Sequence, residues 1–301
     1  MRLAITGGTG FVGSHLIDAA LAAGHEINAL TRREQPPREG VTWIAGDLSS
    51  RDALEQIVRE ADAIIHVAGA ITASNAAGFE EGNVAGTLAM LAASTAGGVQ
   101  RFVHVSSLAA REPKLSLYGA SKARAEELVH SSGLDWAIVR PPAVYGPGDK
   151  ETLELFRMAK LGLMLMPPKG RVSVIHVADL ARLLLALALP GSPSNCLIEP
   201  DDGKPGGWTH REFAKALAAA VGTKAAVVSS PGILLRLAAK ADQLLRGEKA
   251  KLTTDRAAYF SHRNWVVEPK RAPPAGLWRP EIDTLQGLRD TAGWYRDNGW
   301  L

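Results

Sequence analysis

Cysteine is almost absent from this sequence of 301 residues, and long apolar runs are missing altogether. The only cysteine, Cys196, excludes an internal disulfide framework. The most apolar segments, such as LARLLLALAL at 180–189, are shorter than a bilayer span, and this one follows Asp179. The chain does not start with a positively charged stretch that leads into a cleavable apolar run. We therefore expect a cytoplasmic protein without a membrane span.

Neither sign of charge dominates. The 34 Lys and Arg residues exceed the 31 Asp and Glu residues by only three, and the basic residues form no block. Nucleic acid is therefore not an expected partner. Nothing spaced like a metal site surrounds His176, which we expect to be a structural histidine, and we expect no bound metal. The 46% hydrophobic content suffices for one large core, or for a core with a smaller lobe.

Short apolar, β-compatible runs alternate with helical stretches that are rich in alanine. The predicted strands are 2–6, 26–31, 41–46, 63–69, 101–107 and 136–141. Runs that are apolar throughout are typical of parallel strands covered on both faces. The pattern predicts an α/β fold with a Rossmann-type doubly wound parallel sheet, whose ligands bind beyond the carboxyl ends of the strands.

After about residue 145, Pro–Gly turns interrupt this rhythm, as in YGPGD, MPPKG and EPDDGKPGG. The helical segments between the turns predict a smaller C-terminal lobe that binds the substrate. We expect a dinucleotide-binding domain over 1–150 and a substrate-binding lobe over 151–301. Residues 171–190 are expected to return to the first domain.

The glycine-rich stretch TGGTGFVGSH, residues 6–15, follows the first predicted strand and opens the first predicted helix. A GxGxxG pattern in this setting is typical of a phosphate-binding loop, because the helix N-terminus presents free N–H groups to the anion. Glycines permit the tight turn, the approach of a pyrophosphate and close packing of helix on strand. The alternative is a glycine turn without a ligand. The candidate residues here are Gly7, Gly10, Phe11, Val12 and Gly13.

The end of the second strand bears on the choice of dinucleotide. Sites for NAD usually carry a carboxylate there, which bonds the ribose hydroxyls. This chain has Thr31, Arg32 and Arg33 instead, and two guanidiniums can pair with a 2′-phosphate. We therefore favour NADP(H) over NAD(H). The alternative places both arginines on a solvated loop.

Several motifs, in order and over nearly the whole length, resemble the extended short-chain dehydrogenases/reductases, which are grouped with NAD-dependent epimerases and dehydratases. The pattern is most similar to that of the carbonyl reductases and 3-beta-hydroxysteroid dehydrogenase-like members. The motifs are TGGTGFVG at 6–13, GDL at 46–48, HVAG at 66–69, Asn83 in EEGNVAGT, VSS at 105–107, YGASK at 118–122, RPPAVYGPGD at 140–149, VIHVADLA at 174–181 and the closing LWRPEIDTLQGLRDTAGWYRDNGWL.

Tyr118 and Lys122 are four residues apart on a predicted helix, so they share one face. A neighbouring ammonium favours the ionised phenol, and we expect Lys122 to lower the pKa of Tyr118 toward neutrality. Ser107, at the end of the fifth strand, can bond the reacting oxygen. Ser106 competes for this role, but in similar proteins the last serine of the pair bonds the substrate. The alternative is an exposed tyrosine beside a solvated lysine.

The resemblance implies further roles. Lys122 would also bond the nicotinamide ribose, and Asn83 would support a water-linked proton path. Asp47 would bond the adenine amino group while Leu48 flanks the ring, although both fit a simple strand-end turn as well. The residues expected to pass close to the cofactor are Val67, Ala68 and Gly69, and those expected to line the nicotinamide are Pro141, Ala143 and Val144.

Departures from the family pattern guide the prediction of the reaction. Dehydratases of this kind carry Thr-Asp-Glu near the active serine, whereas residues 107–110 read SLAA, so dehydration lacks its acid and base. The short loop between Ser107 and Tyr118 weakens the epimerase interpretation. Two apolar segments, 153–168 and 232–245, suggest a pocket for a hydrophobic ketone, aldehyde or sterol-like alcohol. Lobe core or a dimer face explains both segments equally well.

The sequence thus predicts an NADP(H)-dependent oxidoreductase that interconverts a carbonyl and an alcohol on a small apolar molecule. One alternative is a nucleotide-sugar epimerase with tightly held NAD. Another is a dinucleotide-sensing or assembly protein without catalysis, which would not need Ser107, Tyr118 and Lys122. The helices that carry Asn83 and Tyr118 are also candidates for a homodimer face, as in related enzymes.

Overall fold

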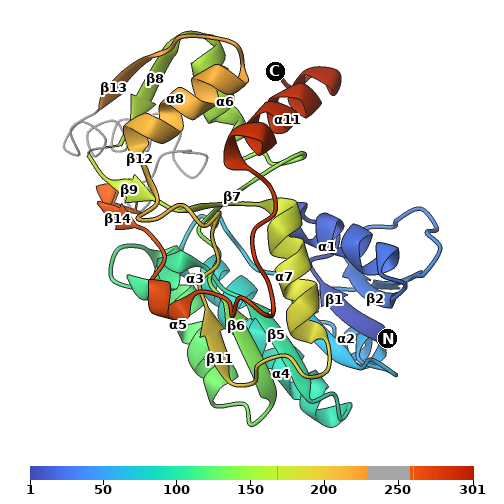
Figure 1. Cartoon of the computed structure of the whole chain (residues 1–301). Helices are drawn as coiled ribbons and strands as arrows, with labels where there is room; N and C mark the ends of the chain where they lie inside the picture. The colour runs from blue at the N-terminus through green and yellow to red at the C-terminus, as the bar shows by residue number, and fades with distance from the viewer. Residues whose placement is uncertain (168, 230–257, 260) are drawn as a thin grey trace. The chain divides into compact units, whose positions relative to one another are not determined.

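The computed structural model describes residues 1–167, 169–229, 258–259 and 261–301 (Figure 1). The chain forms two compact units, each built from segments that are distant in the sequence. The first comprises Met1–Pro141, Leu180–Glu199 and Pro273–Trp278, and the second comprises Pro142–Asp179, Pro200–Ala272 and Arg279–Leu301. Nearly all the candidate site residues lie in the first unit.

A seven-stranded parallel sheet forms the centre of the first unit, in the order β11-β6-β5-β4-β1-β2-β3. The chain runs outward from β1 to β3 and then returns to place β4 on the other side of β1. This reversal is the switch point at which doubly wound sheets bind ligands, and the predicted fold class is confirmed. The strands are β1 (Arg2–Thr6), β2 (Glu26–Thr31), β3 (Val41–Ala45), β4 (Ala63–His66), β5 (Arg101–Val105), β6 (Asp135–Val139) and β11 (Cys196–Ile198).

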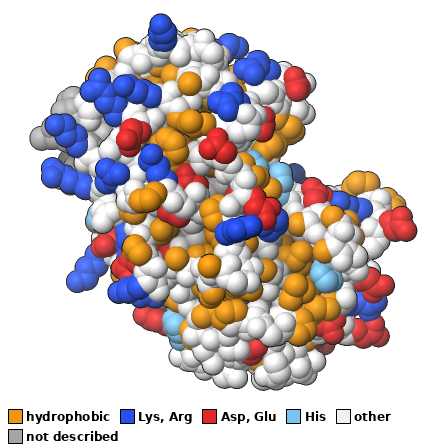
Figure 2. Space-filling view, in the orientation of Figure 1, with side chains coloured by type: hydrophobic (Ala, Val, Ile, Leu, Met, Phe, Trp, Pro, Cys, Tyr) orange, Lys and Arg blue, Asp and Glu red, His pale blue; other side chains and the backbone are white. Residues whose placement is uncertain are grey.

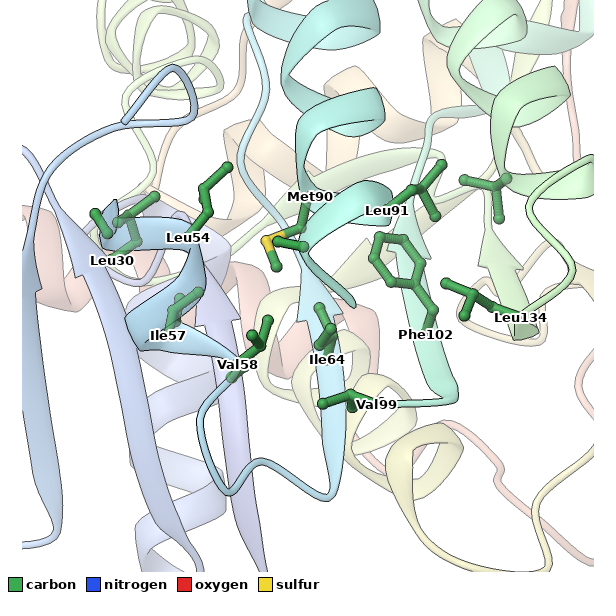
Figure 3. Packing of buried hydrophobic residues seen from close by; sticks show 14 of the residues in the cluster. Leu30, Leu54, Ile57, Val58, Ile64, Met90, Leu91, Val99, Phe102 and Leu134 are labelled. Atoms are coloured by element: carbon green, nitrogen blue, oxygen red, sulfur yellow. The ribbon is translucent and has the colours of Figure 1, made fainter. Parts of the chain in front are cut away.

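Helices cover both faces of this sheet, which is why its central strands are buried throughout. On one face lie α2 (Arg51–Ile57), α4 (Gly86–Ala96) and α5 (Leu117–His130), and on the other lie α1 (Phe11–Ala22) and α7 (Val177–Ala188) (Figure 1). Leu54, Met90 and Phe102 pack together under the first group (Figure 3). Truncation of a fully buried phenylalanine such as Phe102 costs about 3–5 kcal/mol.

Local signals fix the helix ends near the site. Ser116 precedes α5, and its hydroxyl accepts a hydrogen bond from the Gly119 amide at 3.0 Å, which satisfies one free N–H of the first turn. Before α4 come α3 (Ala76–Phe79) and a π-helical segment, η1 (Glu80–Ala85). A 3-10 turn, η2 (Leu108–Arg111), follows β5. These elements bring the ends of β1, β4 and β5 and the start of α5 to one edge of the sheet.

The second unit has its own core, built mainly by α6 (Leu153–Lys160), α8 (His210–Ala220) and α11 (Thr284–Asp297). The short strands of this unit are β7 (Ala143–Tyr145), β8 (Leu163–Met166), β9 (Arg171–Val172), β10 (Val174–His176), β12 (Trp208–Thr209), β13 (Ala226–Ser229) and β14 (Asn264–Trp265). They form the sheets β10-β7, β12-β9-β14 and β13-β8. A 3-10 turn, η4 (Pro269–Arg271), follows β14.

The apolar segment 153–168 is a candidate for a substrate pocket, but some of its large side chains are buried in the core and others are exposed. Phe156, Met164 and Met166 are buried in the core of the second unit, so these three side chains are lobe core. Leu161 and Leu163 are exposed instead. The other candidate segment, 232–245, lies outside the described residues.

Candidate active site

The glycine-rich loop between β1 and α1 requires its glycines for geometric reasons. Gly7 has a φ of +72°, and a Cβ there would lie 2.7 Å from the Ala68 amide nitrogen. A Cβ on Gly13 would overlap the carbonyl of Gly7, which also accepts a hydrogen bond from the Gly10 amide at 3.0 Å. Gly10 caps α1 without a side-chain hydrogen bond, so the amides of Phe11 and its neighbours are left for a ligand. Phe11 and Val12 are half-buried at the start of this helix.

This geometry fits the phosphates of a dinucleotide. The absence of a Cβ at Gly7 and Gly13 lets β1, the loop after β4 and α1 pack closely against one another, and α1 starts with an N-terminus that no side chain caps. The residues of the predicted phosphate site therefore lie together on one loop and the first turn of α1, and their contact with a phosphate remains a prediction.

At the end of β2, two of the three residues predicted to bind the adenosine end of the cofactor, Arg32 and Arg33, lie on the surface. Thr31 is buried, and its hydroxyl donates to the Arg33 carbonyl at 2.6 Å, which fixes a tight turn. The Arg32 and Arg33 side chains are both exposed, and within the described part of the chain neither forms an ion pair. Both guanidiniums are thus accessible to a ligand.

After β3, Asp47 builds the turn that leads into α2. Its Oδ1 accepts hydrogen bonds from the amide and hydroxyl of Ser49, at 2.9 and 2.6 Å, and from the Ser50 hydroxyl. These bonds hold the pKa of the Asp47 carboxyl below its usual range. Leu48 packs on α4, where a Cβ on Gly86 would lie 2.5 Å from its Cδ1.

The loop after β4 is held by side chains of neighbouring elements. Val67 and Ala68 are half-buried and Gly69 is exposed. Asn83, buried in the π-helical segment η1, accepts from the Ala70 amide at 2.8 Å and donates to the Ala70 carbonyl at 2.9 Å. A Cβ on Gly69 would lie 2.6 Å from Asn83 Oδ1 and 3.0 Å from Lys122 Nζ. The loop therefore runs directly past the predicted catalytic lysine.

Ser107 and Tyr118 meet at the edge of the sheet. The Ser107 side chain, half-buried after β5, lies close enough to the Tyr118 phenol to lower its pKa, and its hydroxyl accepts from the Ala109 amide at 3.2 Å. Phe79 packs on the Tyr118 ring, with 6.1 Å between ring centroids. Ser106 is buried, and its hydroxyl donates to the Glu126 carboxylate instead.

The predicted effect on the pKa of Tyr118 is wrong in direction. Burial raises that pKa, and the nearby Ser107 side chain opposes the rise without reversing it. The Lys122 ammonium donates to the Val105 carbonyl at 3.0 Å, and no hydrogen bond links it to the phenol. The structure therefore keeps Tyr118 as a neutral phenol, which is the form that can donate a proton.

Lys122 is buried, with 4% of its surface exposed. Burial lowers its pKa to about 8, and the Glu126 carboxylate one turn along α5 opposes that shift. His66 on β4 and His104 on β5 also face it, and burial together with the lysine charge lowers the pKa of both imidazoles. The two rings stack at 5.6 Å, and His66 bonds Thr6 at 2.7 Å while neither nitrogen of His104 has a hydrogen-bond partner. Lys122 is thus surrounded by neutral rings and one anion.

Sequence reasoning missed a charge network directly behind these residues. Glu126 accepts two hydrogen bonds from Arg140, at 2.8 and 2.6 Å, and one from Ser106. Arg140 also pairs with Glu199 at 3.4 Å, and Glu199 with Arg111 at 3.8 Å. The network joins the ends of β5, β6 and β11 to α5. The spacing of Lys122 and Glu126 by four residues was the only available signal for it.

The residues predicted to line the nicotinamide are divided between the two units, and His176 lies in the second. Pro141 ends the first segment of the first unit, and its carbonyl accepts from the Leu108 amide at 2.9 Å. Ala143 and Val144 lie on β7 in the second unit. His176 is buried against Tyr145 and accepts from the Ala178 amide at 3.2 Å.

The residues that the structure describes contain neither a metal cluster nor a membrane span. Among these residues, no three His, Cys, Asp or Glu side chains gather in a way that could hold a metal ion. None of the described helices is both long and apolar enough to cross a membrane.

Comparison with known proteins agrees with this geometry. The model of the NAD dependent epimerase/dehydratase family matches residues 3–194. Ceramide reductase of Caulobacter vibrioides is 38% identical over 308 residues, which cover 99% of this chain and 96% of that protein. A 4-hydroxy-2-methyl-3-oxo-4-farnesyl-3,4-dihydroquinoline-1-oxide ketoreductase of Stigmatella aurantiaca is 32% identical over 267 residues, 79% of each chain.

Among solved structures, that of MoeE5 in complex with UDP-glucose and NAD has a TM-score of 0.77 at 21% identity and covers 99% of both chains, which shows a shared fold. The family match extends over the glycine-rich loop and over Ser107, Tyr118 and Lys122. The chain therefore belongs to the NAD-dependent epimerase/dehydratase family, the extended short-chain dehydrogenases/reductases, and is an NAD(P)-dependent oxidoreductase that acts on a small molecule.

Proposed function

We propose that the protein is an NADP(H)-dependent carbonyl reductase whose substrate carries long apolar groups. The observation that carries this proposal is the arrangement of Ser107, Tyr118 and Lys122. A buried ammonium lies one helical turn from a neutral phenol whose pKa the nearby Ser107 side chain lowers. These three side chains can bind a carbonyl oxygen and donate a proton to it.

When bound, the reduced nicotinamide supplies a hydride to the carbonyl carbon. Ser107 holds the carbonyl oxygen, and Tyr118 transfers its phenolic proton to that oxygen as the C–H bond forms, which leaves an alcohol and a phenolate. Lys122 carries a positive charge below a pH of about 8 and stabilises the phenolate that Tyr118 becomes. Asn83 holds the Ala70 backbone and the Ser121 hydroxyl beside the site, where a water-linked path can return a proton to Tyr118.

The cofactor preference and the cofactor contacts are part of the proposal. Arg32 and Arg33 pair with the 2′-phosphate of NADP(H), which two exposed guanidiniums without ion pairs can do at little cost. Asp47 offers its second oxygen, Oδ2, to the adenine amino group while Oδ1 keeps the turn. The passage of the cofactor past Val67, Ala68 and Gly69, and its contacts with Leu48, Pro141, Ala143 and Val144, remain predictions.

The proposed substrate class follows from the relatives. The names of the two relatives above describe reduction of a ceramide and of a ring ketone that bears a farnesyl group, both of which combine a polar carbonyl region with long hydrocarbon. We assign this chain a ketone of the same kind, with the carbonyl near the polar end of a lipid-like molecule.

The experiment is a single-turnover assay of NADPH oxidation with long-chain 3-keto amides and short-chain ketones as substrates. Wild type is expected to reduce the long-chain ketone, and Tyr118→Phe to lose about 10²–10⁴ of the rate while still binding NADPH. The matched control is Phe79→Leu, which alters a neighbour of the ring and leaves the phenol in place. Interconversion of nucleotide sugars without net NADPH oxidation would contradict the proposal in favour of an epimerase. Full biological function of Tyr118→Phe would contradict catalysis itself.

Two further proposals concern the assembly and its location. The outer faces of α4 and α5 form a homodimer contact, because Leu88 and Leu117 are exposed there by 54% and 42%. The single, half-buried Cys196 suits a reducing compartment, and we propose the cytoplasm.

A further inference from the structure

One face of the two-stranded sheet β8–β13 in the second unit is apolar and exposed. The strands pair in parallel, with Leu163 opposite Ala226 and Leu165 opposite Val228. Successive side chains on a strand point to opposite sides, so these four residues share one face. The exposed fractions are 47% for Leu163, 54% for Leu165 and 48% for Val228. We call this set the β8–β13 face.

The other side of the same sheet explains why the exposure is unusual. Met164 and Met166 point the opposite way and are buried in the core of the second unit. An antiparallel or two-stranded sheet with one buried face normally carries polar residues on the other. Leu161, just before β8, adds a side chain that is 84% exposed. A cluster of large apolar side chains in this position marks an interaction surface.

Basic side chains outnumber acidic ones around the face, and acidic residues, Glu154 and Glu212, directly precede the two segments that carry it. Residues 155–178 and 213–229, which contain β8 and β13, include six Lys and Arg residues and no Asp or Glu. All six are exposed: Arg157, Lys160, Lys169, Arg171, Lys215 and Lys224. Two of them already have partners, because Arg157 pairs with Glu154 at 2.8 Å and Arg171 donates to the Gly206 and Gly207 carbonyls. Figure 2 shows Lys and Arg side chains, with hydrophobic ones and fewer Asp and Glu side chains between them, over the part of the molecule where Figure 1 draws β8, β13 and α6.

Two of these lysines are fixed at one end of the face. Lys160 ends α6 directly before Leu161, and Lys224 precedes Ala226 by two residues. The Ala226 amide donates to the Gly162 carbonyl at 2.9 Å, so the two segments lie side by side. Apolar side chains flanked by ammonium groups match the interface of an anionic bilayer, where hydrocarbon lies beneath phosphate.

We propose that the β8–β13 face docks the protein reversibly on the surface of an anionic lipid bilayer. Leu161, Leu163, Leu165 and Val228 enter the boundary between head groups and acyl chains, while Lys160 and Lys224 pair with lipid phosphates. This goes beyond the proposed reaction, because docking requires neither cofactor nor ketone. The two ammonium groups at one end of the face, Lys160 and Lys224, favour an anionic lipid surface over a second copy of this face, because the like charges of two such ends would repel each other.

The test is cosedimentation of the full chain with phosphatidylcholine vesicles that contain roughly a quarter phosphatidylglycerol, without cofactor or substrate. Wild type is expected to bind these vesicles, and to bind pure phosphatidylcholine at least roughly tenfold more weakly. The double variants Leu163→Ser/Leu165→Ser and Lys160→Glu/Lys224→Glu should each lose roughly tenfold or more of this binding. The matched control is Leu285→Ser, because Leu285 is 44% exposed on α11 of the same unit.

NADPH titration and thermal unfolding show that each variant is folded. The proposal is overturned if wild type does not bind anionic vesicles, or if Leu163→Ser/Leu165→Ser binds them as wild type does. It is also overturned if the leucine variants change the molecular mass in sedimentation equilibrium and leave vesicle binding unaltered, since the face would then join two copies. Loss of reductase activity with intact vesicle binding would contradict only the proposed function.

Discussion

At the scale of single residues, the charge of Lys122 depends on one neighbour. Burial pushes its pKa down to about 8, and among the charged groups around it the Glu126 carboxylate is the one that pushes it back up. His66 and His104, on the two adjacent strands, are neutral near pH 7 because burial lowers the pKa of both imidazoles. Removal of the Glu126 charge should therefore lower the pKa of Lys122 further.

We expect Glu126→Gln to move the alkaline limb of the pH profile of kcat/KM for ketone reduction to lower pH. The proposed mechanism needs the Lys122 ammonium, so wild-type activity should fall as pH rises through about 8. Without the Glu126 charge, burial alone acts, the pKa of Lys122 falls further, and the loss begins at lower pH. The measurement is kcat/KM for NADPH-dependent reduction from pH 6 to 9.

The control for this variant is the next residue along α5. Glu127 is exposed, so Glu127→Gln removes the same charge without touching Arg140 or Ser106 and should leave the profile unchanged. A variant that merely weakens the fold would lower activity at all pH values by one factor. An unshifted alkaline limb in Glu126→Gln would therefore contradict the role given to this carboxylate.

Arg32 and Arg33 decide the dinucleotide in the proposed function. Their joint replacement by Ser should weaken NADPH binding by about a hundredfold or more, because each of the two lost charge-assisted hydrogen bonds contributes about 1.5–3 kcal/mol. NADH binding should change less than twofold, because NADH has no 2′-phosphate. Fluorescence titration of both nucleotides measures this, with the exposed Arg38→Ser as control. An equal loss of affinity for NADH and NADPH would show that the arginines do not bind the 2′-phosphate.

His104 ties the stability of the first unit to pH. In the unfolded chain a histidine takes up a proton near pH 6.5, but burial holds the folded pKa of His104 well below that. Below about pH 6.5 the unfolded state thus binds more protons, and the free energy of unfolding falls as the pH drops. His104→Phe should reduce this slope by up to about 1.4 kcal/mol per pH unit between roughly pH 6 and 4.

Urea unfolding at a series of pH values gives that slope. His130→Phe, which changes an exposed histidine of α5, is the matched control. Removal of the unpartnered ring nitrogens should also make His104→Phe at least as stable as wild type at pH 7. An unchanged slope would mean that the buried imidazole does not titrate with unfolding.

Site residues that are close together in the sequence could be predicted, whereas contacts between distant segments could not. Tyr118 and Lys122 could be paired because helical spacing places residues four apart on one face. Arg140 contacts Glu126 across strands and a helix, and no local spacing encodes such a contact. The expected fall in the pKa of Tyr118 failed because charge proximity was considered without the opposing effect of burial.

At the scale of elements, the loop from β1 to α1 is the most constrained piece of the first unit. Gly13→Ala would place a Cβ against the Gly7 carbonyl, and the loop must move to accept it. We expect a loss of about 1–3 kcal/mol in the free energy of unfolding and a loss of NADPH binding. Gly293→Ala on α11 is the control, since nothing lies within 4 Å of its added Cβ.

That control should stabilise the protein by about 0.5–1 kcal/mol, because alanine has less backbone freedom to lose in a helix than glycine. Urea unfolding and NADPH titration measure both variants. Normal NADPH affinity in Gly13→Ala would mean that the close approach of α1 to the loop is not needed for cofactor binding.

Six of the seven strands of the main sheet were predictable, because each is an apolar run bounded by turn residues. The seventh, β11, has only three residues and follows the turn-rich LPGSPSN, so no periodicity could develop. The π-helical turn around Asn83 was equally hidden, since composition does not distinguish it from the α-helix that it joins.

At the scale of the whole molecule, the chain passes repeatedly between its two units. Leu180–Glu199 and Pro273–Trp278 return to the first unit after long excursions. The first return overlaps the expected return of residues 171–190, whereas that of Pro273–Trp278 was not expected, because the alternation of strands and helices does not show which surfaces pack together. The doubly wound sheet itself was predictable from that alternation, and the family resemblance agreed with it over nearly the whole chain.

The proposed homodimer is also a property of the whole molecule, and its contact surface is formed by α4 and α5. These helices pack side by side, with Leu88 exposed on α4 and Leu117 on α5. Small side chains, Ala120 and Ala123, line a groove along α5 beside Leu117. A second copy can therefore approach closely and bury both leucines about a two-fold axis.

We expect sedimentation equilibrium to give twice the mass of one chain for wild type, and Leu88→Asp/Leu117→Asp to raise the dimer dissociation constant by at least about a hundredfold. Each introduced carboxylate would otherwise be buried without a partner, at a cost of about 3–5 kcal/mol. Leu163→Asp, on the β8–β13 face, is the control that should leave the dimer intact. A dimer that survives the α4–α5 variant but dissociates in the control would transfer the contact to the β8–β13 face. That outcome would remove both the proposed dimer and the proposed bilayer docking, because one face cannot be covered by a second copy and by lipid at once.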